Sequence, residues 1–161
     1  MAVAAKHPRL DVRALLFFLI VTLGAGFLGS LPGGFETYET LKAPPLAPPA
    51  AVFLPVWVVL YILMAVAATL VWDTGSYDRA VSLRFYFAQL AVNALWPLFF
   101  FRLEWRLFAF FWILLLIALI TLTMAGFKYL RPAAYWLMVP YLLWTLFAAY
   151  LNLGFFLLNS V

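Results

Sequence analysis

The sequence contains no cysteine and only one histidine, His7, among its 161 residues. The absence of cysteine excludes disulfides, thiolate metal sites and cysteine nucleophiles. Because His7 lies in the N-terminal tail, it is poorly placed to ligate a metal or a haem. We therefore expect no metal site, no cofactor and no catalytic residues of the usual nucleophilic kinds.

Charge is scarce as well. Only 10% of the residues are charged and 68% are hydrophobic, whereas soluble domains are about 25% charged and about 45–50% apolar. This composition excludes a soluble domain and indicates a protein that lies in a lipid bilayer. On such a protein the net charge of +4 reports orientation in the membrane, so we expect no nucleic-acid partner.

Five apolar segments lie between the charged residues, and each is close to the roughly 20 residues that a membrane-spanning helix needs. Strands of a membrane barrel would be about ten residues long with alternating polarity, a pattern that these segments do not show. The sequence predicts an all-α fold, a five-helix transmembrane bundle that forms a single domain over residues 1–161. The predicted helices are residues 14–31, 50–72, 80–101, 107–127 and 132–158.

The first of these segments also resembles a signal peptide, because basic residues precede it and small residues end it. Its apolar run is long for that role. Ala25 and Gly29 form a small-xxx-small pair that suits close helix packing, which favours a retained helix.

One loop is long. Residues 32–49 contain five of the ten prolines, so this stretch cannot be helical throughout. We predict either an ordered, extended cover over one end of the bundle or a flexible linker.

Basic residues are distributed unequally between the two ends of the predicted bundle. Seven fall on the side of the N-terminus and three on the other side, which favours a cytoplasmic N-terminus and an outside location for the long loop. The host membrane is not specified. The seven are Lys6, Arg9, Arg13, Arg79, Arg84, Lys128 and Arg131, and the three are Lys42, Arg102 and Arg106.

No charged residue lies in the middle of any predicted span. Ion-coupled transporters and proton relays usually place ionisable groups there, so the sequence disfavours a proton-driven pump and acid–base catalysis inside the bilayer.

Aromatic and amide side chains instead recur at helical spacing inside three spans, so that each set shares one face. If these faces converge, they enclose a pocket that suits a flat, largely apolar, conjugated ligand. The alternative is that the aromatic residues lie at the membrane interface and the amides join helices. The three sets are Trp57 and Tyr61; Gln89, Asn93 and Trp96; and Tyr141, Trp144, Ala148 and Asn152.

Three sequence blocks resemble the TspO/MBR family, the tryptophan-rich sensory proteins related to the mitochondrial translocator protein. The first block is Tyr38-x-x-Leu41-x-x-Pro44 followed by Pro48-Pro49, Phe53, Trp57, Tyr61 and Met64. The second is Ala88-Gln89-Leu90-x-x-Asn93-x-Leu95-Trp96 followed by Phe100-Phe101. The third is Pro140-Tyr141-Leu142-x-Trp144-x-x-Phe147-Ala148-x-x-Leu151-Asn152.

This resemblance implies a five-helix membrane protein, commonly a homodimer, that binds a tetrapyrrole such as protoporphyrin IX and, in some members, sterols or synthetic drug-like ligands. The porphyrin is then a ligand and not a cofactor. The implied ligand contacts are Tyr38, Trp57, Tyr61, Asn93, Trp144 and Ala148. Residues that would lie around these contacts are Lys42, Gln89, Tyr141, Phe147 and Asn152.

The chain departs from the family pattern in the long loop. Thr37 and Leu46 replace two loop tryptophans, and Ala43 replaces a lysine for which Lys42 could substitute. These changes weaken any expectation of loop indoles that react with a bound pigment.

Three functions follow as hypotheses. The first is a receptor, carrier or regulator of porphyrin levels. The second is light-dependent porphyrin degradation that uses Trp57 and Trp144. The third is a passive dimeric scaffold, for which the small residues Ala88, Ala91 and Ala94 would form the contact.

Overall fold

The computed structural model describes residues 10–160, and these residues form six α-helices and no β-strand. Lys6, His7 and Arg9, to which the sequence analysis assigned places in the N-terminal tail, lie outside the described residues. A 3₁₀ turn, η1 (Ala50–Val52), precedes α3, and a π-helical turn, η2 (Leu98–Arg102), follows α4. The α-helices are α1 (Val12–Ser30), α2 (Thr37–Thr40), α3 (Phe53–Trp72), α4 (Arg79–Pro97), α5 (Arg106–Leu130) and α6 (Pro132–Leu158).

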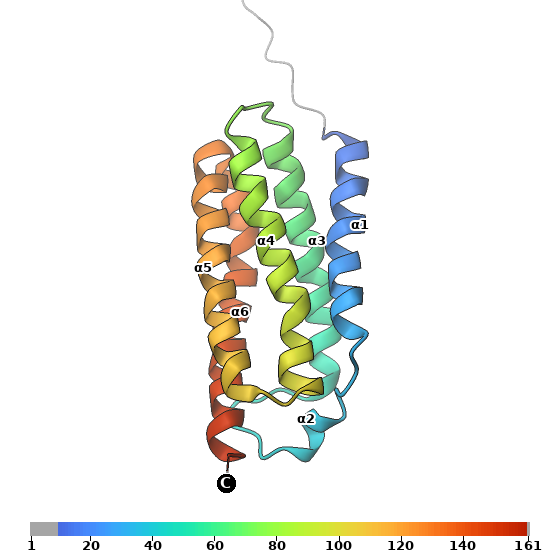
Figure 1. Ribbon diagram of the computed structural model, residues 1–161. Helices are drawn as coiled ribbons and strands as arrows, with labels where there is room; N and C mark the ends of the chain where they lie inside the picture. The colour runs from blue at the N-terminus through green and yellow to red at the C-terminus, as the bar shows by residue number, and fades with distance from the viewer. Residues whose placement is uncertain (1–9, 161) are drawn as a thin grey trace, which may run out of the picture.

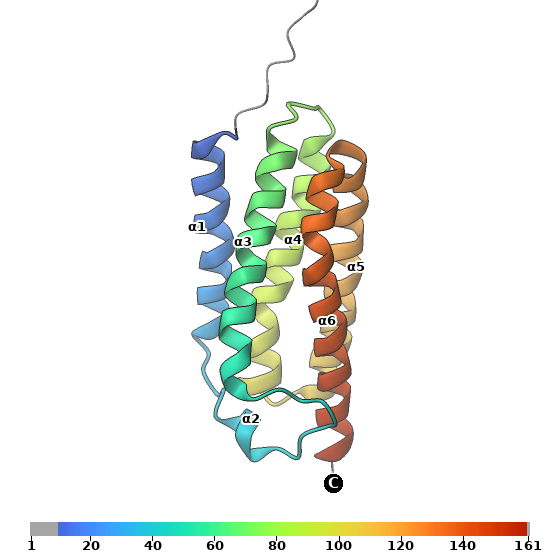
Figure 2. The same cartoon turned by 180° about the vertical axis from the view of Figure 1, so that it is seen from behind.

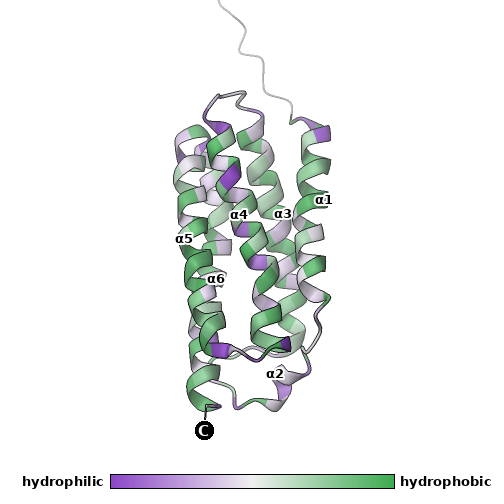
Figure 3. Ribbon diagram, in the orientation of Figure 1, coloured by the Kyte–Doolittle hydropathy of each residue, from purple (hydrophilic) through white to green (hydrophobic). Residues whose placement is uncertain are grey.

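The predicted all-α class is confirmed, and the five long helices coincide with the five predicted segments. The prediction missed α2, a single turn inside the long loop, so the described residues contain six helices instead of five. Four segments of residues 10–160 are long and apolar enough to cross a membrane: Val12–Ser30, Ala50–Trp72, Arg106–Leu130 and Pro132–Leu158. Helix α4 is not among them, and Figure 3 shows hydrophilic residues along it.

The five long helices lie side by side and alternate in direction (Figures 1 and 2). Around the bundle, each helix contacts the next in the order α1, α3, α6, α5, α4, and α4 contacts α1 again. A single residue, Arg131, separates α5 from α6. The helices therefore enclose a common interior.

At the end of the bundle that holds the N-terminus, this interior is filled. The largest fully buried side chains there include Tyr86, Phe127 and Met138. The hydroxyls of Thr22 and Tyr86 form a hydrogen bond between α1 and α4. Because hydrocarbon offers no partner to a hydroxyl, this pairing satisfies both groups inside the bundle.

Helices α1 and α4 approach closely at Gly29. A Cβ atom at this position would lie 3.0 Å from the carbonyl oxygen of Ala94, so a side chain here would push the two helix backbones apart. Gly29 of the predicted small-residue pair therefore lies in a contact between α1 and α4, and Ala94 is its partner on α4.

The long loop is an ordered cover, the first of the two predicted alternatives. The phenol of Tyr150 on α6 donates a hydrogen bond to the carbonyl of Pro45 (2.7 Å). Lys42 and Asn159 are joined twice: the Lys42 amide donates to Asn159 Oδ1 (2.9 Å), and Asn159 Nδ2 donates to the Lys42 carbonyl (3.1 Å). Together these bonds fasten the loop across the end of α6.

Candidate functional site

A cavity of about 540 Å³ lies in the half of the bundle nearest to the long loop. Ligand pockets in proteins commonly have volumes of about 300–1,000 Å³, so this cavity is large enough for an organic ligand. All five long helices and the loop contribute to its wall. Eleven aromatic residues line it: Phe27, Phe35, Tyr38, Phe53, Trp57, Tyr61, Trp96, Phe100, Phe101, Trp144 and Phe155.

The structure brings all six residues of the predicted ligand-contact set to the wall of this cavity. The residues come from the loop, α3, α4 and α6, which are far apart in the sequence. They are Tyr38, Trp57, Tyr61, Asn93, Trp144 and Ala148.

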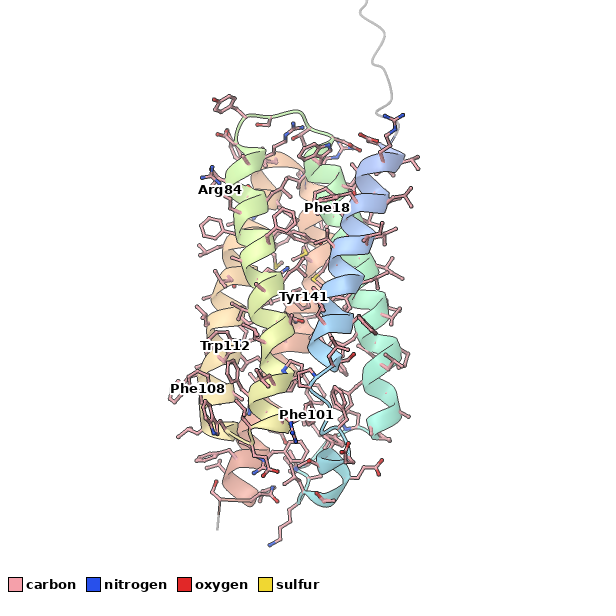
Figure 4. All side chains as sticks on the ribbon, turned by 45° about the vertical axis from the view of Figure 1, so that its right-hand side comes forward. Phe18, Arg84, Phe101, Phe108, Trp112 and Tyr141 are labelled. Carbon is pink, nitrogen blue, oxygen red and sulfur yellow. The ribbon has the colours of Figure 1, made fainter. Side chains whose placement is uncertain are left out.

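Of the five residues predicted to lie around them, only Asn152 lines the cavity. Gln89 and Tyr141 are completely buried, and Figure 4 shows Tyr141 within the bundle. Phe147 packs between Trp144 and Tyr150 on α6. Lys42 is exposed in the loop and is not part of the wall.

The polar groups at the inner end of the cavity form one chain of hydrogen bonds. The Tyr61 phenol donates to Asn93 Oδ1 (2.8 Å), and Asn93 Nδ2 donates to the Tyr141 phenol (3.0 Å). The Tyr141 phenol in turn donates to Gln89 Oε1 (2.7 Å). A connected network of this kind holds its members in fixed positions, so Tyr61 and Asn93 form a rigid end to the cavity.

Edge and stacked ring contacts connect the aromatic side chains of the wall. The rings of Trp57 and Tyr61 stack with centroids 5.5 Å apart. Phe53 makes edge contacts with Trp144 (5.9 Å) and with Tyr38 (5.1 Å). Because the rings support one another, the wall presents flat apolar surfaces in defined orientations.

The indole nitrogen of Trp144 is buried and has no hydrogen-bond partner within the described residues. A buried donor that lacks a partner costs about 1–3 kcal/mol. The Trp144 ring lines the cavity, while its indole nitrogen is covered by neighbouring atoms at that cost.

No charged side chain lines the cavity among the residues that the structure describes. Within residues 10–160, no three His, Cys, Asp or Glu side chains lie close enough together to hold a metal ion. The wall therefore offers ring faces, methyl and methylene groups, and a few neutral donors.

Tyr38 lines the cavity from the loop. Its phenol donates to the carbonyl of Pro48 (2.6 Å), and burial raises the pKa of this phenol above its ordinary value. Tyr38 therefore stays a neutral donor at physiological pH and links α2 to the following proline segment.

The role of Gly26 was not predicted from the sequence. The predicted small-residue pair was Ala25 and Gly29, but Gly26 is the residue that faces Tyr61, and a Cβ atom at Gly26 would overlap the Tyr61 ring. The signal was present in the sequence, because Gly26 and Gly29 are three residues apart and so share a helix face.

Comparisons with a family model and with individual known proteins all indicate the same family. Residues 17–158 match the model of the TspO/MBR family. The chain is 36% identical to the "Translocator protein" of Ovis aries, with 84% of this chain and 83% of the relative covered. It is 37% identical to the "Tryptophan-rich protein TspO" of Chlorobaculum tepidum (92% and 98% covered) and 35% identical to the "Tryptophan-rich sensory protein" of Cereibacter sphaeroides (93% and 94% covered).

Proposed function

This chain belongs to the TspO/MBR family of membrane proteins, and from that premise we propose that it binds a tetrapyrrole such as protoporphyrin IX. In this role it acts as a receptor, carrier or regulator of porphyrin levels in the membrane. Sterols and synthetic drug-like molecules are further candidates for the same cavity.

The observation that carries this proposal is the aromatic, uncharged wall of the 540 Å³ cavity. A flat conjugated macrocycle gains most from surfaces of this kind, because its faces stack on rings and its apolar edges contact apolar side chains.

The wall also constrains how an acidic porphyrin binds. Burial of a carboxylate without a cationic partner is costly, and within residues 10–160 no lysine or arginine lines the cavity. The macrocycle therefore enters the cavity, and its propionate groups stay at the rim.

Titration with protoporphyrin IX, followed by quenching of tryptophan fluorescence, tests the proposal. We expect saturable quenching that Trp144→Ala weakens and that Trp136→Ala leaves unchanged. Trp136 is a suitable control because it lies on the same helix, is exposed and does not line the cavity. The proposal fails if quenching does not saturate, or if the Trp144 variant binds as tightly as the unmodified chain.

Light-dependent degradation of the porphyrin is a second candidate, because Trp57, Trp96 and Trp144 all line the cavity. Thr37 and Leu46, which replace the two loop tryptophans, do not line the cavity. The absence of tryptophan at these positions therefore removes no aromatic side chain from the wall. Illumination of the complex tests this candidate: a Soret band that decays no faster than in detergent alone excludes it.

We propose that α4 also crosses the membrane, which makes the transmembrane bundle five-helical. Its polar residues Gln89 and Asn93 are buried toward the other helices, whereas Val81, Phe87 and Leu95 are exposed. Helix α4 thus turns an apolar face to the lipid although its average hydropathy is low.

We further propose a homodimer in which α4 of one copy packs on α4 of the other. Ala88 and Ala91 are exposed on α4 and permit close approach of a second helix. Ala94, the third small residue of the predicted contact, packs against Gly29 within the same chain and is not available. A passive scaffold would show this dimer in detergent without binding any porphyrin.

A further inference from the structure

The wall of the cavity is not equally accessible on all sides. Lining residues from α4, α5 and α6 are all buried or half-buried. The exposed ones lie on α1 and α3 and at the start of the loop: Leu23, Phe27, Ser30, Phe35, Leu54 and Val58.

The exposed lining residues of α1 and α3 form two facing edges. Phe27 and Ser30 lie on one face of α1 near its C-terminal end, and Leu54 and Val58 are one turn apart near the start of α3. Helices α1 and α3 are neighbours in the bundle and run in opposite directions. These ends therefore lie beside each other, at the loop end of the bundle (Figure 2).

Both edges are apolar. Phe27 is 66% exposed and Leu54 is 74% exposed, on helices that are long and hydrophobic enough to span a bilayer. The hydroxyl of Ser30 donates to the carbonyl of Phe27 (2.7 Å), so it offers no free donor to the opening. The opening therefore faces hydrocarbon and matches it in polarity.

Further along α1, the gap between the two helices is closed. At Gly26 the Tyr61 ring lies against the backbone of α1, and Tyr61 is fixed by its bond to Asn93. On the water side, the loop lies across the end of the bundle and is fastened to α6 through the Tyr150–Pro45 and Lys42–Asn159 bonds, so entry there requires these bonds to break.

From these observations we infer that the cavity opens sideways into the membrane, between the C-terminal end of α1 and the N-terminal end of α3. The ligand enters and leaves through this opening from the lipid phase, edge first, without opening of the loop. This inference rests on the proposed function, since it concerns the route by which the porphyrin reaches the cavity.

The lack of cysteine in the chain makes the test clean, because one introduced thiol is the only site of modification. Leu54→Cys and Phe27→Cys place an adduct at the opening. Leu143→Cys, on the exposed surface of α6, and Leu46→Cys, in the loop and 83% exposed, serve as controls. Each variant is modified with a bulky, non-fluorescent maleimide, reconstituted into lipid nanodiscs and mixed with protoporphyrin IX in a stopped-flow fluorimeter.

We expect adducts at Leu54 and Phe27 to slow association by about tenfold or more, because association slows when an obstructing group must move before the ligand can bind. They should slow dissociation to a similar extent, so that Kd changes less than either rate. Adducts at Leu143 and Leu46 should leave both rates unchanged.

Two results would overturn the lateral route. One is a slower association only for the Leu46 adduct, which would place entry at the loop; the other is no change for any adduct. If the unmodified chain shows no saturable quenching, the proposed function itself fails and the route fails with it. Saturable quenching that no adduct slows overturns only the lateral route, so the two failures are distinguishable.

Discussion

Gly26 determines how closely the Tyr61 ring approaches α1. A Cβ atom there would overlap the ring at 2.2 Å, so Gly26→Ala must displace the ring and strain its hydrogen bond to Asn93. A hydrogen bond of this kind contributes about 1 kcal/mol to stability. If the displaced ring loses that amount of free energy in the complex, porphyrin affinity falls several-fold in a fluorescence titration.

Gly24→Ala is the matched control on the same helix, because nothing lies within 4 Å of an added Cβ atom at Gly24. We expect this variant to keep the affinity of the unmodified chain. Equal affinity for the Gly26 and Gly24 variants would contradict the proposed role of Gly26.

Leu46 holds a backbone conformation that suits glycine. Its φ is +67°, and its side chain is 83% exposed, so the left-handed conformation costs energy while the side chain makes little packing contact. Because the left-handed region costs a non-glycine residue about 1–2 kcal/mol, Leu46→Gly should raise the thermal unfolding midpoint of the purified protein.

The comparison is Leu31→Gly, an exposed leucine with a φ of −62°. There glycine relieves no strain and only adds freedom to the unfolded chain. A higher unfolding midpoint for the Leu31 variant than for the Leu46 variant would be inconsistent with strain at Leu46.

At the scale of elements, the contact between the loop and α6 depends on Asn159. Its side chain makes both hydrogen bonds to the backbone of Lys42. Asn159→Ala removes both and should free the loop, so that trypsin cleaves after Lys42 more rapidly than in the unmodified chain.

Ser160→Ala is the control for this experiment. Among the described residues, the Ser160 hydroxyl donates only to the carbonyl of Phe156 on α6, so its loss should leave cleavage after Lys42 unchanged. Unchanged cleavage in the Asn159 variant would show that other contacts are sufficient to hold the loop.

The sequence predicted the long helices well, because charged residues and prolines mark where each leaves the membrane. The boundaries agree within three residues when η1 and η2 are counted with α3 and α4. It missed α2 and η2, since a single turn has no periodicity to detect and the π-helical turn depends on how the chain continues beyond Pro97.

Helical spacing also predicted which side chains face the interior, but not how deep they lie. Trp57, Asn93 and Trp144 reach the cavity, whereas Gln89 and Tyr141 stop behind its wall. Depth depends on how the helices are staggered against one another, which spacing within one helix does not report. The position of Lys42 depends on loop conformation and could not be predicted for the same reason.

At the scale of the whole molecule, five of the eight basic residues that the structure describes lie at the end of the bundle that holds the N-terminus. Arg79 and Arg84 lie near the α3–α4 turn, where Figure 4 shows Arg84, and Lys128 and Arg131 lie at the α5–α6 turn. We expect this end to face the cytoplasm and the long loop to face the other side.

Single-cysteine labelling in intact cells checks this orientation. Tyr77→Cys, in the α3–α4 turn, and Leu46→Cys, in the long loop, are both at strongly exposed positions. A membrane-impermeant maleimide should label Leu46→Cys directly and Tyr77→Cys only after permeabilisation. The reverse pattern would show that the bundle is inverted.

The order of helices around the bundle has a consequence for biosynthesis. Helix α6 is made after the other five helices, yet it lies between α3 and α5 and brings Trp144 and Ala148 to the cavity. Until α6 has been made, the nascent bundle therefore lacks the side of the cavity that α6 supplies. Since only Arg131 links α6 to α5, α6 emerges beside its partner, and the pocket closes in the last step of assembly.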